Sequence, residues 1–263
     1  MATRDGAHGW DEYAPFYDWE NARTVGRRDV PFWRGVAQQS PGPVLELGTG
    51  TGRILLPLLK ADVPVIGVDR SAPMLARAAT RVRRVHRQRG HRGGLPLVQG
   101  DMRHLPFADG SFATVLAPYG VLQSLTRERD LSDALASVAR VLAPGGVFGV
   151  DLVPDVPQWQ EYTNRTKLKG AAPRGVHLTL VESVRQDRAR HLTTFAQTYI
   201  ARRGLEVRRH AFDLTFRTLP IPAFVRRLER HGFALDAVLG DYRGGAWDER
   251  ADVWVMLARR VLG

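Results

Sequence analysis

The stretch VLELGTGTGR, residues 44–53, decides the fold of this chain. Its first four residues are mostly apolar, glycines follow at every second position, and Arg53 opens a segment with leucines at helical spacing. Glycine lets the backbone turn sharply and approach a ligand that a Cβ would exclude. The stretch therefore predicts a strand, a tight turn and a helix, which Pro57 limits to a few turns.

The alternation of strands and helices continues to residue 153. Residues 63–68 are an apolar run rich in β-branched side chains, typical of a strand buried on both faces. Ser71 and Pro73 suit the cap and first turn of the helix that follows. Further strands are predicted at residues 95–99, 112–117 and 147–152, the last after a helix that ends at Pro144-Gly145-Gly146. This order predicts a parallel, Rossmann-like sheet covered on both faces.

The pattern changes after Pro154. Residues 177–187, 190–202 and 206–217 each predict a strand, and short polar turns between them indicate an inserted antiparallel sheet. The first pattern then resumes with a helix at 221–231 and strands at 233–239 and 253–259. The expected fold is α/β: a Rossmann-like, mostly parallel seven-stranded sheet with helices on both faces, plus an inserted three-stranded antiparallel cover.

We expect a single domain over residues 1–263. Its expected parts are an N-terminal helical cap (1–40), a ligand-binding core (41–153), the antiparallel insertion over the substrate (154–219), and a C-terminal helix with the last strands (220–263). The hydrophobic content of 44% suits a water-soluble globular protein of this length.

The composition excludes several classes of function. Without cysteine the chain has no disulfide framework, no CxxC zinc site and no nucleophilic thiolate. No run approaches the ~18 apolar residues of a membrane helix, and residues 1–15 lack the apolar segment of a signal peptide. We therefore expect a cytoplasmic protein without a membrane partner. The net charge of +11 is spread along the chain, which makes nucleic acid an unfavoured partner.

The residues that follow the predicted strands indicate a ligand site, because ligands of open α/β sheets bind beyond the strands' carboxyl ends. The glycine-rich turn is neither GxGxxG, since Arg53 stands at the third glycine's position, nor a P-loop. Asp69 lies 21 residues after Gly48, where a carboxylate can accept hydrogen bonds from both hydroxyls of a ribose. Gly100-Asp101-Met102 offers an acceptor for an exocyclic amine beside an apolar side chain.

As a set, and together with Leu142-Ala143-Pro144-Gly145-Gly146, these motifs resemble those of the class I S-adenosylmethionine-dependent methyltransferases over about residues 10–153. The resemblance implies a methyltransferase whose cofactor is S-adenosyl-L-methionine. It places these residues around the cofactor: Gly48, Thr49, Gly50 and Gly52 at the methionine part, Asp69 at the ribose, Asp101 and Met102 at the adenine, and Arg70 and Met74 in the adenosine pocket.

Within that class, residues 13–18 (YAPFYD) and the insertion resemble small-molecule N-methyltransferases of the glycine and amino-sugar type, in which an N-terminal segment folds over the cofactor. The resemblance implies that Tyr17 and Arg28 reach the cofactor's carboxylate and that Tyr13 lies nearer the substrate. An aromatic stripe that packs a helix onto the core is the alternative interpretation. The sequence Ala117-Pro118-Tyr119-Gly120 departs from the Asn/Asp-Pro-Pro-Tyr of enzymes that methylate DNA bases or glutamine amides. Ala113 stands where the common Gly-Ser-Phe-Asp pattern has its acidic residue.

The expected function is transfer of a methyl group to a small-molecule nucleophile, with an amine nitrogen favoured over oxygen. An amine must be neutral to attack, and a phenol usually needs a base. The catalytic candidates are Tyr13, Tyr119 and His210, with His177 and His191 as further bases. His210 shares a face with Phe212, Leu214 and Phe216 by strand alternation, where a histidine can equally serve packing alone.

Two other functions stay open. Arginines at seven positions between 77 and 92 fit an RNA methyltransferase, and a Rossmann-like pocket also fits a non-catalytic scaffold that binds S-adenosylmethionine. The histidines and carboxylates show no metal-ligand spacing such as HExxH, so no metal is expected. The sequence is compatible with a monomer or a homodimer.

Overall fold

A computed structural model describes residues 9–24, 28–90, 93–153, 161–248, 250–251 and 253–261. Within these residues the core is a seven-stranded sheet in the order β10-β11-β5-β4-β1-β2-β3. The strands are β1 (Val44–Leu47), β2 (Val65–Asp69), β3 (Leu97–Gln99), β4 (Phe112–Ala117), β5 (Leu142–Leu152), β10 (Phe233–Leu239) and β11 (Trp254–Arg260). Strands β1 to β5 pair in parallel, and β11 runs antiparallel to both its neighbours. The expected α/β fold is confirmed.

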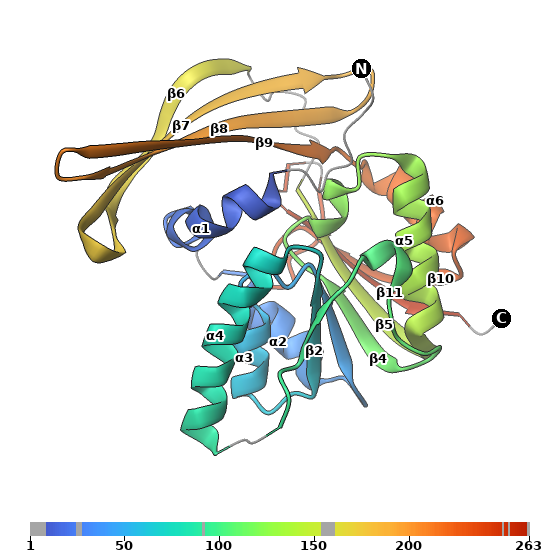
Figure 1. Ribbon diagram of the computed structural model, residues 1–263. Helices are drawn as coiled ribbons and strands as arrows, with labels where there is room; N and C mark the ends of the chain where they lie inside the picture. Colours follow the sequence, from blue (N-terminus) through green and yellow to red (C-terminus); the bar gives the residue numbers. More distant parts are fainter. Residues whose placement is uncertain are drawn as a thin grey trace.

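Helices cover both faces of this sheet (Figure 1). One face carries α2 (Val30–Gln38), α3 (Leu55–Lys60) and α4 (Ala72–Arg89), and the other carries α5 (Glu128–Val141) and α6 (Ile221–Arg230). Each face has its own apolar cluster, one around Trp33 and Leu58 and the other around Leu135 and Phe224. The parallel strands are therefore buried on both sides, as their apolar sequences predict.

Two local predictions in this core are confirmed. Helix α3, which contains Pro57, is only six residues long. Ser71 caps α4, because its side-chain oxygen accepts a hydrogen bond from the backbone N–H of Met74 at 3.3 Å. These signals are local, so the sequence alone could carry them.

The start of β5 differs from the prediction. Helix α5 ends at Val141 and β5 already begins at Leu142, so Pro144-Gly145-Gly146 lies inside the strand. Leu142 pairs with Phe112 and Val147 with Thr114, which makes the intervening residues an irregularity in the ladder. A strand can bulge at glycines with positive φ, and Gly145 has a φ of 73°.

The antiparallel insertion has four strands where three were predicted. Its strands are β6 (Tyr162–Ala172), β7 (Val176–Asp187), β8 (Leu192–Arg203) and β9 (Glu206–Arg217), paired in that order. The missed strand, β6, lies at the sheet edge and exposes most of its side chains. An exposed edge strand needs no alternation of apolar residues, so its sequence YTNRTKLKGAA carried no strand signal.

Helix α1 (Trp10–Asn21) lies between the antiparallel sheet and the core (Figure 1). Phe16 stacks on Tyr199 of β8, with ring centroids 4.1 Å apart. On the core side, Thr51 donates a hydrogen bond to Asp18 Oδ1 at 2.7 Å, and Arg81 Nη2 pairs with Asp18 Oδ2 at 2.7 Å. The aromatic stripe therefore packs α1 mainly against the antiparallel sheet, where packing onto the core was the interpretation from sequence, and Asp18 holds the helix to the core.

Short 3-10 turns complete the described elements: η1 (Met102–His104), η2 (Val121–Ser124) and η3 (Pro173–Gly175). The described helices include none with the length and apolar character that a membrane span requires.

Candidate active site

The glycine-rich turn after β1 depends on its glycines. Gly48, Gly50 and Gly52 have φ values of 59°, 55° and 83°, in the left-handed region that favours glycine. A Cβ added to Gly48 would lie 2.3 Å from Cγ2 of Val121. The turn therefore keeps its backbone close to η2, where no side chain fits.

Asp69, at the end of β2, ties this turn to the start of α4. Its Oδ2 accepts a hydrogen bond from the Gly50 N–H at 2.7 Å, and its Oδ1 accepts one from the Ser71 N–H at 2.8 Å. Burial raises the pKa of Asp69, and these backbone hydrogen bonds offset part of the rise. The carboxylate is thus held in one orientation at the strand end.

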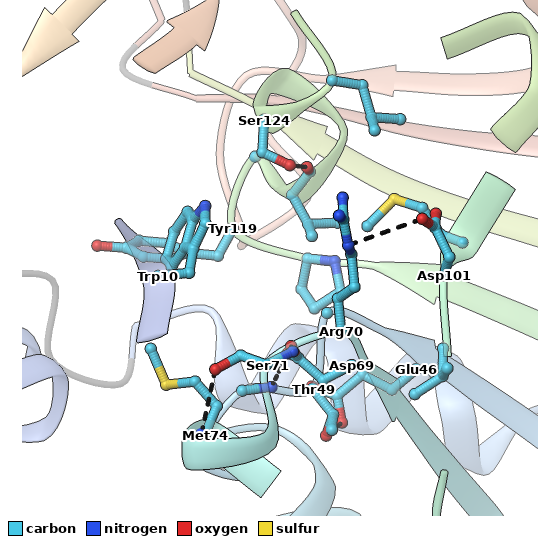
Figure 2. A pocket seen from close by; sticks show the side chains of 18 of the residues that line it. Trp10, Glu46, Thr49, Asp69, Arg70, Ser71, Met74, Asp101, Tyr119 and Ser124 are labelled. Atoms are coloured by element: carbon cyan, nitrogen blue, oxygen red, sulfur yellow. Dashed lines mark hydrogen bonds and ion pairs between the residues drawn. The ribbon is translucent and has the colours of Figure 1, made fainter. Parts of the chain in front are cut away.

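A cavity of about 230 Å³ opens beyond the carboxyl ends of β1 to β4, and Figure 2 shows Asp69, Arg70, Asp101 and Tyr119 around it. It gathers ten of the residues predicted for the site: Tyr17, Gly48, Thr49, Gly50, Asp69, Arg70, Met74, Asp101, Met102 and Tyr119. Asp69 and Asp101 line the same cavity, as expected for residues at the carboxyl ends of neighbouring parallel strands.

Two predicted cofactor residues lie outside this cavity. Gly52 is not part of its lining, although its N–H donates to the Thr49 carbonyl at 2.8 Å within the turn. Arg28 is exposed and does not line the cavity. The cation beside Tyr17 is Arg53 instead.

In the sequence, Arg53 stood out only as the residue that breaks the GxGxxG pattern. Its position directly after the turn could have indicated that its side chain lies at the site. Its Nη1 lies 2.5 Å from Oδ1 of Asp29, and its guanidinium lies 4.9 Å from the centroid of the Tyr119 ring. Burial would lower the pKa of Arg53, but Asp29 and Tyr17 outweigh it and raise the pKa. Burial raises the pKa of Tyr17 to about 12, against the opposing charge of Arg53.

Glu46 is a second buried carboxyl group at this site. It is 2% exposed and accepts a hydrogen bond from the Thr49 hydroxyl at 2.9 Å. Burial raises the pKa of Glu46 to about 8, against the lowering effect of Thr49 and Arg53. The turn after β1 therefore has beside it a permanent cation, Arg53, and a carboxyl group, Glu46, whose pKa burial raises.

Asp101 lines the cavity but is already paired. The Arg103 guanidinium donates to Oδ1 at 3.0 Å and to Oδ2 at 2.6 Å, and Arg70 Nε lies 3.8 Å from Oδ2 (Figure 2). Burial alone would raise the pKa of Asp101, but Arg103 outweighs it and lowers the pKa. The Arg103 backbone N–H also donates to Oδ1 at 3.0 Å and its Nε to Oδ2 at 3.1 Å, so Arg103 makes two hydrogen bonds to each oxygen of Asp101.

A second cavity, of about 280 Å³, adjoins the first under the antiparallel sheet. The two cavities share Trp10, Tyr17, Tyr119, Gly120 and Phe216. The second is lined by Tyr13 of α1 and by apolar side chains of β8 and β9. Its charged lining residues are Glu20 and Glu182, and no arginine, lysine or histidine of the described chain lines it.

Glu20 anchors a small tyrosine network in this second cavity. Tyr13 donates its hydroxyl to Glu20 Oε2 at 2.9 Å, and Tyr199 donates to the same oxygen. Burial raises the pKa of Glu20, although these two hydrogen bonds lower it in part. Burial likewise raises the pKa of Tyr13, so Tyr13 is a hydrogen-bond donor and Glu20 is the better base.

The histidines proposed as bases lie elsewhere. His177, His191 and His210 are exposed, and none of them lines either cavity. His210 occupies the predicted face of β9, opposite Tyr199, and its ring centroid lies 5.2 Å from that of Phe16. Alternation predicted the correct face, but the cavity lies further along the strand, at Leu214 and Phe216.

The substitution Asp69→Asn is expected to weaken binding of S-adenosylhomocysteine by at least about 30-fold, or about 2 kcal/mol. An amide has one acceptor oxygen, so either the Gly50 or the Ser71 N–H would face the NH2 group. Titration calorimetry measures the change. Asp62→Asn is the matched control, since the Asp62 side chain is 71% exposed. A change under about threefold for Asp69→Asn would contradict the assignment of this cavity to the nucleoside.

Comparisons with known proteins agree with this geometry. Residues 44–146 match a family described as a methyltransferase domain. A demethylmenaquinone methyltransferase of Thermus thermophilus is 35% identical over 159 residues, which cover 57% of this chain and 66% of that enzyme. The chain spans about three fifths of the length of the curated relatives it matches.

Solved structures match over nearly the whole chain. The CcbJ methyltransferase from Streptomyces caelestis superimposes with a TM-score of 0.74 at 22% identity, covering 96% of this chain and 97% of that one. The sugar N-methyltransferase KedS8 from Streptoalloteichus sp. also gives a TM-score of 0.74, at 18% identity and with 94% and 93% covered. Residues 44–146 therefore match the methyltransferase domain family, and the chain shares the fold of solved methyltransferases over nearly its whole length.

Proposed function

We propose that this chain methylates an amine nitrogen of a small molecule, with S-adenosylmethionine as the methyl donor. The observation that carries the proposal is the second cavity, which adjoins the strand-end cavity and has carboxylates as its only charged lining among the described residues. The similarity to a sugar N-methyltransferase in fold agrees with it.

The residues of the first cavity fit the cofactor. The turn at Gly48 leaves room for a ligand against the backbone, Asp69 offers carboxylate oxygens beside it, and Arg53 offers a buried cation. In this proposal Asp69 holds the ribose, Asp101 and Met102 hold the adenine, and Tyr17 with Arg53 holds the cofactor's carboxylate. When bound, S-adenosylmethionine supplies a methyl group on a positively charged sulfur.

The sign of the charge in the second cavity supports an amine. The chain carries a net charge of +11, yet this cavity is lined by Glu20 and Glu182 without a described basic residue. Carboxylates in an enclosed, aromatic-lined space favour a cationic group, both through their charge and through the faces of the aromatic rings. Phenolates and carboxylates would be repelled there.

Glu20 provides the base that an ammonium substrate needs. The carboxylate takes one proton from the ammonium nitrogen, which leaves a neutral amine with a free lone pair and a protonated Glu20. Tyr13 and Tyr199 keep Glu20 in place through their hydroxyls. Trp10, Tyr119 and Phe216, at the junction of the two cavities, exclude water and orient the nitrogen toward the first cavity.

Product analysis tests the proposal directly. The purified chain is incubated with S-adenosylmethionine and a panel of small amines, phenols and carboxylic acids, and mass spectrometry follows the gain of one methyl group. We expect methylation of amines. Methylation confined to phenols or acids would contradict the proposal, and silence from a folded sample that binds S-adenosylhomocysteine would favour the non-catalytic scaffold.

The arginine-rich segment at 77–92 gives no comparable support for RNA methylation. Arg81 pairs with Asp18 and Arg89 with Asp62, so two of its cations serve contacts within the chain. Arg92 lies outside the described residues. RNA binding with a steep dependence on salt would be the sign of that alternative.

A further inference from the structure

Glu182 breaks the apolar inner face of β7. Leu178, Leu180 and Val184 share that face and are buried, and Glu182 between them is only 6% exposed. A buried carboxylate is costly unless hydrogen bonds satisfy it. The Tyr162 hydroxyl donates to its Oε1, and Gln197 Nε2 donates to its Oε2 at 3.0 Å. No described lysine, arginine or histidine forms an ion pair with Glu182.

Gln197 presents an acceptor that has no partner. It pairs with Glu182 in the register of β7 and β8, lines the second cavity and is 5% exposed. The carboxylate of Glu182 requires the NH2 group of the amide on its side, which turns Oε1 away from Glu182. That oxygen is buried and accepts no hydrogen bond from the described residues. A buried acceptor without a hydrogen-bond donor needs an explanation, and a donor group on a bound ligand would provide it.

The position of Gln197 separates this acceptor from Glu20. Gln197 and Tyr199 lie two residues apart on the same face of β8, about 7 Å along the strand. Tyr199 bonds to Glu20, and Gln197 bonds to Glu182. The cavity thus has two polar positions: Glu20, held by Tyr199, and Gln197 with Glu182, two residues away along β8. Phe195, Leu214 and Phe216 form apolar lining between the sheet and α1.

We propose that Gln197 and Glu182 form a second anchor for the substrate, which accepts a hydrogen bond from a hydroxyl or a second ammonium group. The substrate class is then a compact cyclic amine with a second donor group across the ring from the methylated nitrogen. This inference rests on the proposed function, because Glu20 must hold the reacting amine for Gln197 to hold the other end. Gln197 is a specificity-determining residue, and it takes no part in proton transfer.

Three matched amines test the second anchor: cyclohexylamine, trans-4-aminocyclohexanol and trans-cyclohexane-1,4-diamine. Calorimetry with the enzyme saturated in S-adenosylhomocysteine measures their affinities, and kcat/KM is measured separately. We expect at least one of the two bifunctional amines to bind about tenfold tighter than cyclohexylamine. Gln197→Leu should abolish this preference. Glu182→Gln should weaken binding of the diamine more than binding of the amino alcohol. This difference shows whether the anchor holds an ammonium group or a hydroxyl group.

The control variant is Gln88→Leu, on the exposed side of α4, which should leave all three affinities unchanged. Urea unfolding establishes that each variant is folded. If the wild-type enzyme methylates all three amines with equal affinity and kcat/KM, the second anchor is wrong and the proposed function stands. If the enzyme binds S-adenosylhomocysteine but neither binds nor methylates any of the three, both the anchor and the amine proposal are contradicted.

Discussion

Arg53→Met is expected to lower the free energy of unfolding by about 3–5 kcal/mol, because it leaves the buried carboxylate of Asp29 without its counter-charge. The Asp29 side chain is fully buried and that of Arg53 is 11% exposed, so little water is available to replace the guanidinium. Asp29 Oδ2 has no partner among the described residues, which leaves the Arg53 contact as the main compensation for this charge. Urea unfolding followed by circular dichroism measures the loss.

Two further variants make this test specific. Arg89→Met removes a pair with Asp62 whose side chains are 34% and 71% exposed, and it should cost only about 0–1 kcal/mol. The double variant Arg53→Met with Asp29→Asn removes the uncompensated charge and should recover much of the lost stability. A loss of under about 1 kcal/mol for Arg53→Met would show that Asp29 does not depend on Arg53.

Glu20→Gln is expected to reduce kcat for amine methylation about a hundredfold at neutral pH, the usual size of a general-base effect. Glutamine keeps an oxygen that accepts from Tyr13 and Tyr199, so the variant removes the base and preserves the network. The Glu20 pKa is raised by burial, so in the wild-type enzyme kcat should fall as the pH drops through that raised value.

The pH dependence of the variant separates a base from a merely structural residue. In Glu20→Gln the bound ammonium must lose its proton without the carboxylate, so kcat should rise with pH toward the pKa of the bound amine and recover part of the loss. Stopped assays of kcat from acidic to alkaline pH measure this, with Glu206→Gln, an exposed glutamate paired with Arg208, as the control. A loss that is equal at every pH would contradict proton transfer by Glu20.

Most of the predicted site residues that line the first cavity lie at or just after the ends of strands. Asp69 ends β2, Asp101 follows β3 and the glycines of residues 48–52 follow β1. Parallel strands bring their carboxyl ends to one edge of the sheet. Chain order and strand direction are enough to bring these residues together. Ten predicted site residues therefore line the first cavity.

Two of the cavity residues that the sequence missed, Glu20 and Glu182, are carboxylates on apolar faces. Glu20 lies in register with the aromatic stripe of Tyr13, Phe16 and Tyr17, and Glu182 interrupts the apolar alternation of β7. A charged residue at a position whose neighbours are all buried was a usable signal for a polar group inside a cavity. His210 satisfied the same alternation and lies outside the cavity, since alternation states the face and not the distance along the strand.

The sequence by itself determined the α/β core, the turns at its carboxyl edge and Asp69 beside them, because each depends on residues near in the chain and on the direction of parallel strands. Only the tertiary structure decided what faces that edge. Glu20 of α1, Glu182 of β7 and Gln197 of β8 line one cavity under the antiparallel sheet, and Arg53 pairs with Asp29. Such contacts depend on how separate elements pack in three dimensions, which no periodicity within a single element records.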